Sequence, residues 1–446
     1  MARDSNVERS ECLVVERKGS MAKTEVVAGI TTFLTMAYIV LVNPLILEEA
    51  HMDRHAVAIV TCLASALTTV LMGLVGRVPI AMAPGMGLNA FLATTLVGQG
   101  QITWQAALGV VFLSGLLGVV LTLAGLRKRL VEAIPGSLVT AISVGIGLFI
   151  TFIGLVFMGV IVKNDKTLVA AGPITGTVAI GLAGLLLMVF LEIRKIKGSL
   201  LIGIVFSTLL AALFGYIEHP SALASFSYDI RPVAFQLDIL GALKWSLFGS
   251  IFTLMFMDMF DGLGTLVACC HEAGKVDEQG KIRGLGRLLA LDASASMIGA
   301  LLGTSSVTAY IESIAGIEQG GRTGLTALVT ALCFVLALLF VPLVEIVPKY
   351  ATGPALVMVG LFMMKEVRRI DFAKLEEGLP AFAIMVMIAL SYSISMGLAF
   401  GFISFVLIKL VAGKARDVKL TMWAIALLSL LFVAMGNLRA IFSSTQ

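Results

Sequence analysis

The sequence predicts an all-α polytopic membrane protein, and three observations support this prediction. Of the 446 residues, 59% are hydrophobic and only 13% are charged, with a mean hydropathy of +1.01; soluble domains carry about 25% charged residues. Apolar runs of about 20 residues, enough for a helix to cross a bilayer, follow one another along most of the chain. The 32 Lys and Arg residues gather in alternate loops.

The apolar runs form fifteen segments. We expect helices rather than barrel strands, because a helix satisfies its own backbone in lipid. In chain order the expected segments are 26–47, 55–76, 79–97, 103–126, 135–160, 174–193, 198–217, 243–267, 288–302, 303–320, 323–346, 352–367, 377–394, 396–412 and a last one at 420–436.

The loops give the expected orientation. With the amino terminus in the cytoplasm, 25 of the 32 Lys and Arg fall on the cytoplasmic side. One missed helix would invert every later loop, so this bias supports both the orientation and the segment count. The polar, mixed-charge residues 1–23 do not resemble a cleavable signal peptide.

Two of the segments are poor helices. Segment 79–97 contains "PIAMAPGMGLNAF" and segment 303–320 contains "GTSSVTAYIES". Pro and Gly in the first, and small hydroxyl and β-branched residues in the second, disfavour a continuous helix. Interrupted backbone at membrane depth occurs only where protein or an aqueous cavity satisfies it. We therefore expect both segments to be broken beside an internal cavity.

An internal repeat relates the two halves of the chain. "VEAIPGSLVTAISVGIGLF" from Val131 and "VEIVPKYATGPALVMVGLF" from Val344 share 7 of 19 positions at an offset of 213 residues. Basic residues precede the first copy and follow the second, so the copies face opposite sides of the membrane. Inverted repeats with a broken span in each half are typical of alternating-access transporters with a binding site near the midplane.

Four acidic residues lie inside expected spans: Asp258, Asp261, Asp292 and Glu312. A charge at the bilayer centre costs about 2.5–3.5 kcal/mol on insertion scales, so each must be paired, protonated or hydrated. Asp258 and Asp292 are expected to support the site, with backbone capping as the alternative. Glu312 begins a half-helix, and Asp261 precedes "GLG", which lets a ligand approach. Both are candidates for substrate binding and proton coupling.

Other side chains near the breaks suit a planar heterocycle. The amide of Asn89 offers a donor and an acceptor for a base edge. Phe91 and Tyr310 offer faces for stacking, while Thr35 and Thr308 offer hydroxyls. Packing or capping is the alternative for each. The four histidines form no ligand-like cluster, so we expect no metal and no cofactor.

Five motifs in order resemble the AzgA-like purine (adenine/guanine/hypoxanthine) permeases of the nucleobase-cation symporter superfamily. They are "TTFLTMAYIVLVNP", "APGMGLNAF", "FDGLGTL", "GTSSVTAYIES" and "GGRTGLTA". The resemblance implies 14 transmembrane spans as two inverted repeats of seven, with spans 3 and 10 broken by short strands, and import of a purine with a proton.

The resemblance also implies a core domain and a gate domain. The core would comprise 26–126 and 243–346, and the gate 127–217 and 347–412. They lie between a cytoplasmic segment, 1–25, and a carboxyl-terminal segment, 413–446, whose apolar stretch can cross, lie in the interface or pack on the gate. We expect a multi-pass protein of the bacterial cytoplasmic (inner) membrane that binds purine, proton and lipid but no nucleic acid. A homodimer is left open.

Residue by residue, the binding asparagine of the family falls on Asn89, its span 8 aspartate on Asp261 and its span 10 glutamate on Glu312. Asp292 also fits the family pattern. Gly262 departs from it, because many relatives have Ser or Thr there, and this leaves the purine preference open. The "GTSSVT" motif ranks adenine slightly before guanine and hypoxanthine.

Three alternatives remain. The same fold could carry another nucleobase, or an anion such as sulfate or bicarbonate, although the acidic pair argues against an anion. An intramembrane aspartyl protease would place Gly-x-Gly before its second aspartate, whereas "DGLG" has the acid first. We therefore expect a transporter and not an enzyme.

Overall fold

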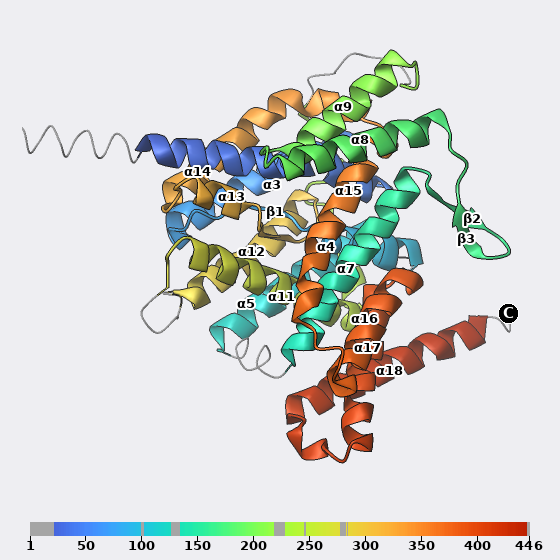
Figure 1. Cartoon of the computed structure of the whole chain (residues 1–446). Helices are drawn as coiled ribbons and strands as arrows, with labels where there is room; N and C mark the ends of the chain where they lie inside the picture. Colours follow the sequence, from blue (N-terminus) through green and yellow to red (C-terminus); the bar gives the residue numbers. More distant parts are fainter. Residues whose placement is uncertain are drawn as a thin grey trace, which may run out of the picture.

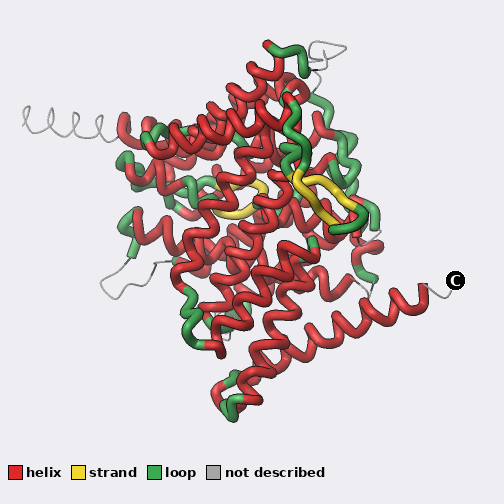
Figure 2. The backbone as a smooth tube through the Cα atoms, turned by 45° about the vertical axis from the view of Figure 1, so that its right-hand side comes forward, coloured by secondary structure: helices red, strands yellow, loops and turns green. Residues whose placement is uncertain are grey.

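The computed structural model describes residues 22–99, 102–125, 134–217, 228–244, 247–276, 282 and 284–443. The described chain is a bundle of helices with two small sheets (Figures 1 and 2). The expected cytoplasmic segment lies largely outside the described residues, as do the first three residues of the repeat copy that begins at Val131.

The first half begins with a helix over 22–36, which a turn separates from the next element. The elements that follow are α2 (Ile39–Glu48), α3 (Arg54–Leu71), η1 (Met72–Gly76), β1 (Met82–Pro84), α4 (Met86–Ala90), η2 (Phe91–Gln99), α5 (Trp104–Leu123), α7 (Gly136–Phe157), β2 (Ile161–Asn164), β3 (Leu168–Ala171), α8 (Gly176–Ile193) and α9 (Ser199–Leu213).

The second half begins with a short helix before its first long one. Its elements are α10 (Ile239–Ala242), α11 (Phe248–Glu272), α12 (Leu285–Leu302), β4 (Val307–Ala309), α13 (Ser313–Glu318), α14 (Gly324–Ala337), η4 (Leu338–Ile346), α15 (Lys349–Met364), η5 (Lys365–Arg369), α16 (Leu375–Ser391), α17 (Ile394–Val411), η6 (Ala415–Asp417) and α18 (Leu420–Ser443).

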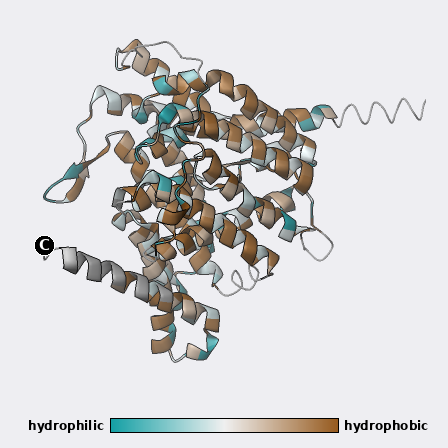
Figure 3. Cartoon of the chain, turned by 180° about the vertical axis from the view of Figure 1, so that it is seen from behind, coloured by the Kyte–Doolittle hydropathy of each residue, from teal (hydrophilic) through white to brown (hydrophobic). Residues whose placement is uncertain are grey.

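The all-α membrane architecture is confirmed. Nine helices of the described chain are long and apolar enough to cross a membrane, and two shorter apolar helices, Met86–Gly98 and Ser199–Leu213, accompany them. In Figure 3 most of the helical ribbon has the colours of hydrophobic residues. The count of fourteen spans stays a prediction, because several expected spans are shorter than a full crossing or are interrupted.

Local chemistry explains several helix starts. The side chains of Asp53, Thr103, Thr175, Thr323 and Ser393 each accept a hydrogen bond from a backbone N–H in the first turn of α3, α5, α8, α14 and α17, respectively. Such caps satisfy amides that lack a partner inside the helix. These polar residues therefore end the loops and fix where the helices begin.

Both expected breaks are confirmed. Each contains a three-residue strand, and β1 pairs with β4 in antiparallel register, with Ala83 opposite Thr308. Both strands are fully buried. Figure 2 shows this small sheet inside the bundle. Because the strands pair with each other, the interrupted backbone is satisfied without exposure to lipid.

The helices pack in two sets. In one set α7 lies against α15 and α16, and α15 lies against α8 and α9; in the other, α3 lies against α14, and α5 lies against α11 and α12. Figure 1 shows α7 and α15 side by side. The first set falls in the segments expected for the gate and the second in those expected for the core, and the domain boundaries themselves stay a prediction.

The structure adds a hairpin that the sequence did not indicate, and it distinguishes among the alternatives for the last apolar stretch. A β2–β3 hairpin occupies the loop between the fifth and sixth expected spans, and Figure 2 shows it at the edge of the molecule. Helix α18 packs against α17 at its start, where Met422 and Ile425 are buried. Its far end runs away from the bundle (Figure 1), so only the beginning of the last apolar stretch packs on the gate segments.

Candidate functional site

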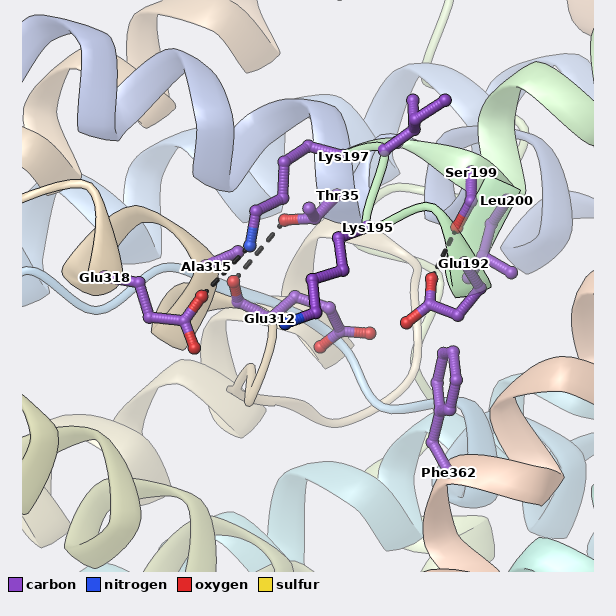
Figure 4. Close-up of a pocket in the computed structure, with 12 residues that line it drawn as sticks. Thr35, Glu192, Lys195, Lys197, Ser199, Leu200, Glu312, Ala315, Glu318 and Phe362 are labelled. Atoms are coloured by element: carbon purple, nitrogen blue, oxygen red, sulfur yellow. Dashed lines mark hydrogen bonds and ion pairs between the residues drawn. The ribbon is translucent and has the colours of Figure 1, made fainter. Parts of the chain in front are cut away.

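A cavity of about 350 Å³ lies between the two helix sets. This volume is within the usual range for small-molecule pockets. Figure 4 shows the cavity with its lining side chains as sticks. One wall consists of Thr35 from the helix over 22–36 and Glu312, Ala315 and Glu318 at α13; the other consists of Glu192, Lys195–Leu200 between α8 and α9, and Phe362 of α15.

Glu312 is the acidic residue that connects this cavity with the broken segments. It lies directly after the strand and turn of the second break, at the start of α13. The hydroxyl of Tyr38 donates a 2.6 Å hydrogen bond to Glu312 Oε1. The hydroxyl of Thr35 donates a longer bond, 3.4 Å, to the backbone oxygen of Glu312. Tyr38 reaches the carboxylate because a turn at residues 37–38 interrupts the first span.

Asp261 belongs to the same group of acids. It interacts electrostatically with Asp292 and Glu312. Its side chain is exposed, whereas the neighbouring Phe260 and Gly262 on α11 are buried. Carboxylates whose charges interact repel one another unless a proton or a ligand N–H lies between them. Asp261 is thus influenced by the charges of Asp292 and Glu312, although it does not line the cavity.

Asp258 and Asp292 contact the residues around β4. Asp258 accepts hydrogen bonds from the hydroxyls of Ser296 at 2.9 Å and Ser306 at 3.0 Å. Asp292 accepts from the hydroxyl of Thr308 at 3.1 Å and from the backbone N–H of Ala309 at 3.2 Å. The hydroxyl of Thr308 is therefore used inside the protein, and its side chain is only 1% exposed.

Gly262 makes room for Asp292. A Cβ atom at position 262 would lie 2.7 Å from Asp292 Cγ and closer still to Asp292 Oδ2. Since separations under 3.0 Å between such atoms require a shift, a side chain here would displace the carboxylate. Many relatives are expected to have Ser or Thr at this position. In this chain the glycine coincides with a close approach of the Asp292 carboxylate.

Asn89, Phe91 and Tyr310 do not line the cavity. Asn89 is fully buried in α4, where its amide donates to Asn43 and accepts from the hydroxyl of Ser305. Phe91 is fully buried in the hydrophobic core. The hydroxyl of Tyr310 donates to the backbone oxygen of Pro84 at 2.6 Å. Of the expected binding residues, only Thr35 and Glu312 line the cavity directly.

Sequence reasoning missed several contributors. Asn43 is a polar position in the first apolar run, and that polarity was the available signal. Tyr38, in the same run, is a weak candidate from the sequence, and the structure bonds it to Glu312. Lys195 is an ordinary basic loop residue in the sequence, yet Figure 4 shows it pointing toward Glu312. Lys197 forms a 3.0 Å ion pair with Glu318 that joins the two cavity walls. Phe362 places an aromatic ring on the wall formed by the predicted gate.

The described residues contain no group of three or more His, Cys, Asp or Glu side chains arranged to hold a metal ion. The site can therefore be described by its own groups: carboxylates that accept hydrogen bonds and protons, hydroxyls, an aromatic ring and lysines. This set suits a neutral, planar molecule with N–H groups.

Comparison with known proteins gives the family context. The Permease family profile matches residues 23–402. The chain is 44% identical to the putative permease MJ0326 of Methanocaldococcus jannaschii, covering 94% of this chain and 95% of that protein. It is 41% identical to the adenine permease AdeQ of Escherichia coli, covering 94% of both chains. It is 39% identical to the guanine/hypoxanthine permease PbuG of Bacillus subtilis, covering 93% of this chain and 97% of the other.

Solved structures share the fold at low sequence identity. The transmembrane domain of the cyanobacterial bicarbonate transporter BicA matches with a TM-score of 0.61 and 16% identity, covering 83% of this chain and 95% of that one. The murine anion transporter Slc26a9, in its inward-facing state, matches with a TM-score of 0.62 and 13% identity, covering 86% of this chain and 68% of that one.

Proposed function

Because the chain belongs to the Permease family, and is thus a multi-pass membrane transporter and not an enzyme, we propose that it imports a purine nucleobase together with a proton. The observation that carries this proposal is the cavity between the two helix sets, with Glu312 on its wall. The membership removes the protease alternative and supports the predicted resemblance to purine permeases.

Adenine is the first candidate among the purines. The relatives named adenine permeases are 41% and 42% identical to this chain, and those named guanine/hypoxanthine permeases reach 39%. The difference is small, so guanine and hypoxanthine belong in the same experiment.

The cavity walls offer complementary contacts. The Glu312 carboxylate accepts a hydrogen bond from a purine N–H, while Tyr38 holds its Oε1 in place. Phe362, on the opposite wall, offers a ring face for the planar base. Asp261 supplies a second acceptor in the same cluster. Asn89 remains a predicted binding residue from the first break, although it is buried and does not line the cavity in this conformation.

Proton coupling would use the same acids. A purine N–H needs an ionised carboxylate as its acceptor. A proton on one of Asp261 and Glu312 removes the repulsion between them and lets the other stay ionised for the purine N–H, so binding of the base and binding of the proton favour each other. Release of the proton or of the purine into the cytoplasm then lowers the affinity of the site for the remaining ligand.

Alternating access would move the predicted core against the predicted gate. The ion pair between Lys197 and Glu318 joins them at the cavity. Lys349, at the start of α15, pairs with Glu48 and Glu49 at the end of α2, which forms a second junction. Relative motion of the two domains must break or exchange these exposed pairs, which costs little because each is worth about 0–1 kcal/mol.

We also propose the cytoplasmic membrane as the location, with the amino terminus inside. The positive-inside distribution supports this orientation. It places Lys195 and Lys197, and therefore one wall of the cavity, on the cytoplasmic side.

Uptake of labelled adenine, guanine, hypoxanthine and uracil in cells lacking their own permeases tests the proposal. We expect purines, adenine foremost, to accumulate, uracil not to, and a protonophore to abolish accumulation. Sulfate and bicarbonate serve as competitors for the anion alternative. Purine accumulation that is unchanged by the protonophore would contradict proton symport. Absence of purine uptake would contradict a purine as the substrate.

A further inference from the structure

A chain of buried amide and hydroxyl groups connects four segments of the bundle. Asn43 of α2 bonds to Thr61 of α3, to Thr304 before β4 and to Asn89 of α4, and Asn89 bonds in turn to Ser305. All five side chains are 0% exposed. Buried polar groups of this kind need partners of the correct polarity, because no water can replace a missing one.

The direction of the hydrogen bonds follows from Thr61. Its hydroxyl donates to the backbone oxygen of Val57 at 2.6 Å. A hydroxyl has one hydrogen, so Thr61 offers only lone pairs to its other neighbour. Asn43 must therefore turn its NH₂ group toward Thr61, at 2.7 Å. The same NH₂ group donates to Thr304 at 3.0 Å.

The orientation of Asn43 then determines that of Asn89. With its NH₂ group used by Thr61 and Thr304, Asn43 presents its carbonyl oxygen to Asn89, which donates to it. The carbonyl oxygen of Asn89 consequently faces Ser305 and accepts from its hydroxyl. These bonds use one N–H and one lone pair of the Asn89 amide, which has two of each. The remaining N–H and lone pair have a fixed direction.

We propose that Asn43 is a positioning residue that orients the amide of Asn89 and thereby sets the purine affinity and preference of the site. Reversal of the Asn43 amide would place its carbonyl against the lone pairs of Thr61. It would also place two NH₂ groups face to face at Asn89. The effect on purine binding rests on the proposed function, in which Asn89 belongs to the purine site, whereas the orientation itself does not.

Thermal unfolding of the purified, purine-free protein tests the orientation directly. If Asn43 acts through Asn89, the double variant Asn43→Ala/Asn89→Ala should lose no more melting temperature than the more affected single variant. If the losses of melting temperature in the two single variants add in the double variant, the coupling between Asn43 and Asn89 is overturned. Ser65→Ala is the control, because Ser65 of the neighbouring helix α3 is a buried hydroxyl with no hydrogen-bond partner in the described part of the chain.

Purine competition tests the consequence for binding. Thr61→Val keeps the shape of the side chain but removes the lone pairs. It should raise the purine KM several-fold and change the order in which adenine, guanine and hypoxanthine compete, with a smaller effect on maximal rate. Thr61→Ser keeps the oxygen and should behave like the wild type. An unchanged KM and competition order in Thr61→Val would overturn the proposal.

The two measurements separate the two proposals. If the wild type transports no purine, the proposed function fails, while the unfolding cycle still decides whether Asn43 orients Asn89. If the wild type transports purines but Thr61→Val competes normally, only the positioning role fails. A merely structural role for Asn43 would lower the melting temperature without changing the order of competing purines.

Discussion

Gly147 of α7 and Gly360 of α15 pack backbone against backbone. A Cβ atom at Gly147 would lie 3.0 Å from the backbone oxygen of Gly360, and a Cβ at Gly360 would clash with the backbone oxygen of Gly147. The two glycines are also equivalent positions of the repeat, 213 residues apart. A two-fold axis that relates inverted repeats brings equivalent positions together where it passes between two helices. The two-fold axis of the predicted repeat would therefore pass between α7 and α15.

Replacing Gly360 with Ala should loosen this helix pair. The new methyl group would clash with the hydroxyl of Thr151 and the backbone of Gly147. Overpacking of this kind costs about 1–3 kcal/mol, so thermal unfolding of the purified protein should begin at a lower temperature. Gly136→Ala, on the same helix as Gly147, is the control, because its Cβ would meet nothing within 4 Å. Equal stability of the two variants would contradict the close packing.

Glu312→Gln should abolish proton-driven purine accumulation while the protein stays in the membrane. The amide keeps the shape and can still accept from Tyr38, but it cannot exchange a proton. Uptake with and without a protonophore, normalised to protein level, measures the effect. Glu366→Gln is the control, because Glu366 pairs with Arg369 of the same short helix and does not line the cavity. Full accumulation by Glu312→Gln would remove this residue from the coupling.

Asp261→Asn should also abolish accumulation. Loss of the charge removes the electrostatic link to Asp292 and Glu312, so a proton no longer affects purine binding at this position. Counterflow, which exchanges purine without net proton movement, should decrease less than accumulation does. Accumulation at the wild-type level would show that Asp261 takes no part in it.

Gly262→Ser should disturb the site through Asp292. The added Cβ would push the Asp292 carboxylate away from Thr308 and Ala309, weakening the hold on β4. We expect lower purine affinity and a loss of about 1–3 kcal/mol in stability, measured by KM and thermal unfolding. Gly264→Ser, two residues later on α11, is the control, because a Cβ there would meet nothing within 4 Å. If Gly262→Ser and Gly264→Ser both have the KM and the stability of the wild type, the predicted clash with Asp292 is contradicted.

The carboxylate of Glu376 should respond to acid. Hydrogen bonds from Lys409 and Lys414 lower the pKa of Glu376 from 4.5 to about 2. Because the folded pKa is depressed, the stabilisation is complete above about pH 4.5 and is lost as the pH falls toward 2. The melting temperature of the wild type should fall across this window more than that of Glu376→Gln. Parallel pH profiles would mean that the ion pairs contribute nothing measurable.

Much of the fold was predictable because its signals are local. Each expected apolar segment corresponds to a helix or a broken span, since hydrophobicity over 20 residues does not depend on distant partners. The breaks at "PIAMAPGMGLNAF" and "GTSSVTAYIES" were also predictable, because Pro, Gly and small polar residues disfavour helix wherever they stand. The β2–β3 hairpin was not, because its short, exposed strands lack a clear alternation.

The site was predictable only in part. An acid in an apolar run is conspicuous, so Asp261 and Glu312 could be selected from the sequence. In the structure the charge of Glu312 acts on Asp261, and Glu312 lines the cavity. The walls of the cavity could not be selected. Lys195 and Phe362 are ordinary residues of a loop and a helix, and only packing of the two helix sets brings them opposite Glu312.

By itself, the sequence determined that this chain crosses a membrane repeatedly, that two spans are broken and that four acids need compensation there. Only the tertiary structure decided which groups compensate them: Tyr38 meets Glu312 across 274 residues of chain, and Ser306 meets Asp258 across 48. The physical reason is that burial makes a hydrogen-bond partner obligatory without specifying it. Any donor of suitable reach would serve, so the choice belongs to the packing of segments that are distant in the chain.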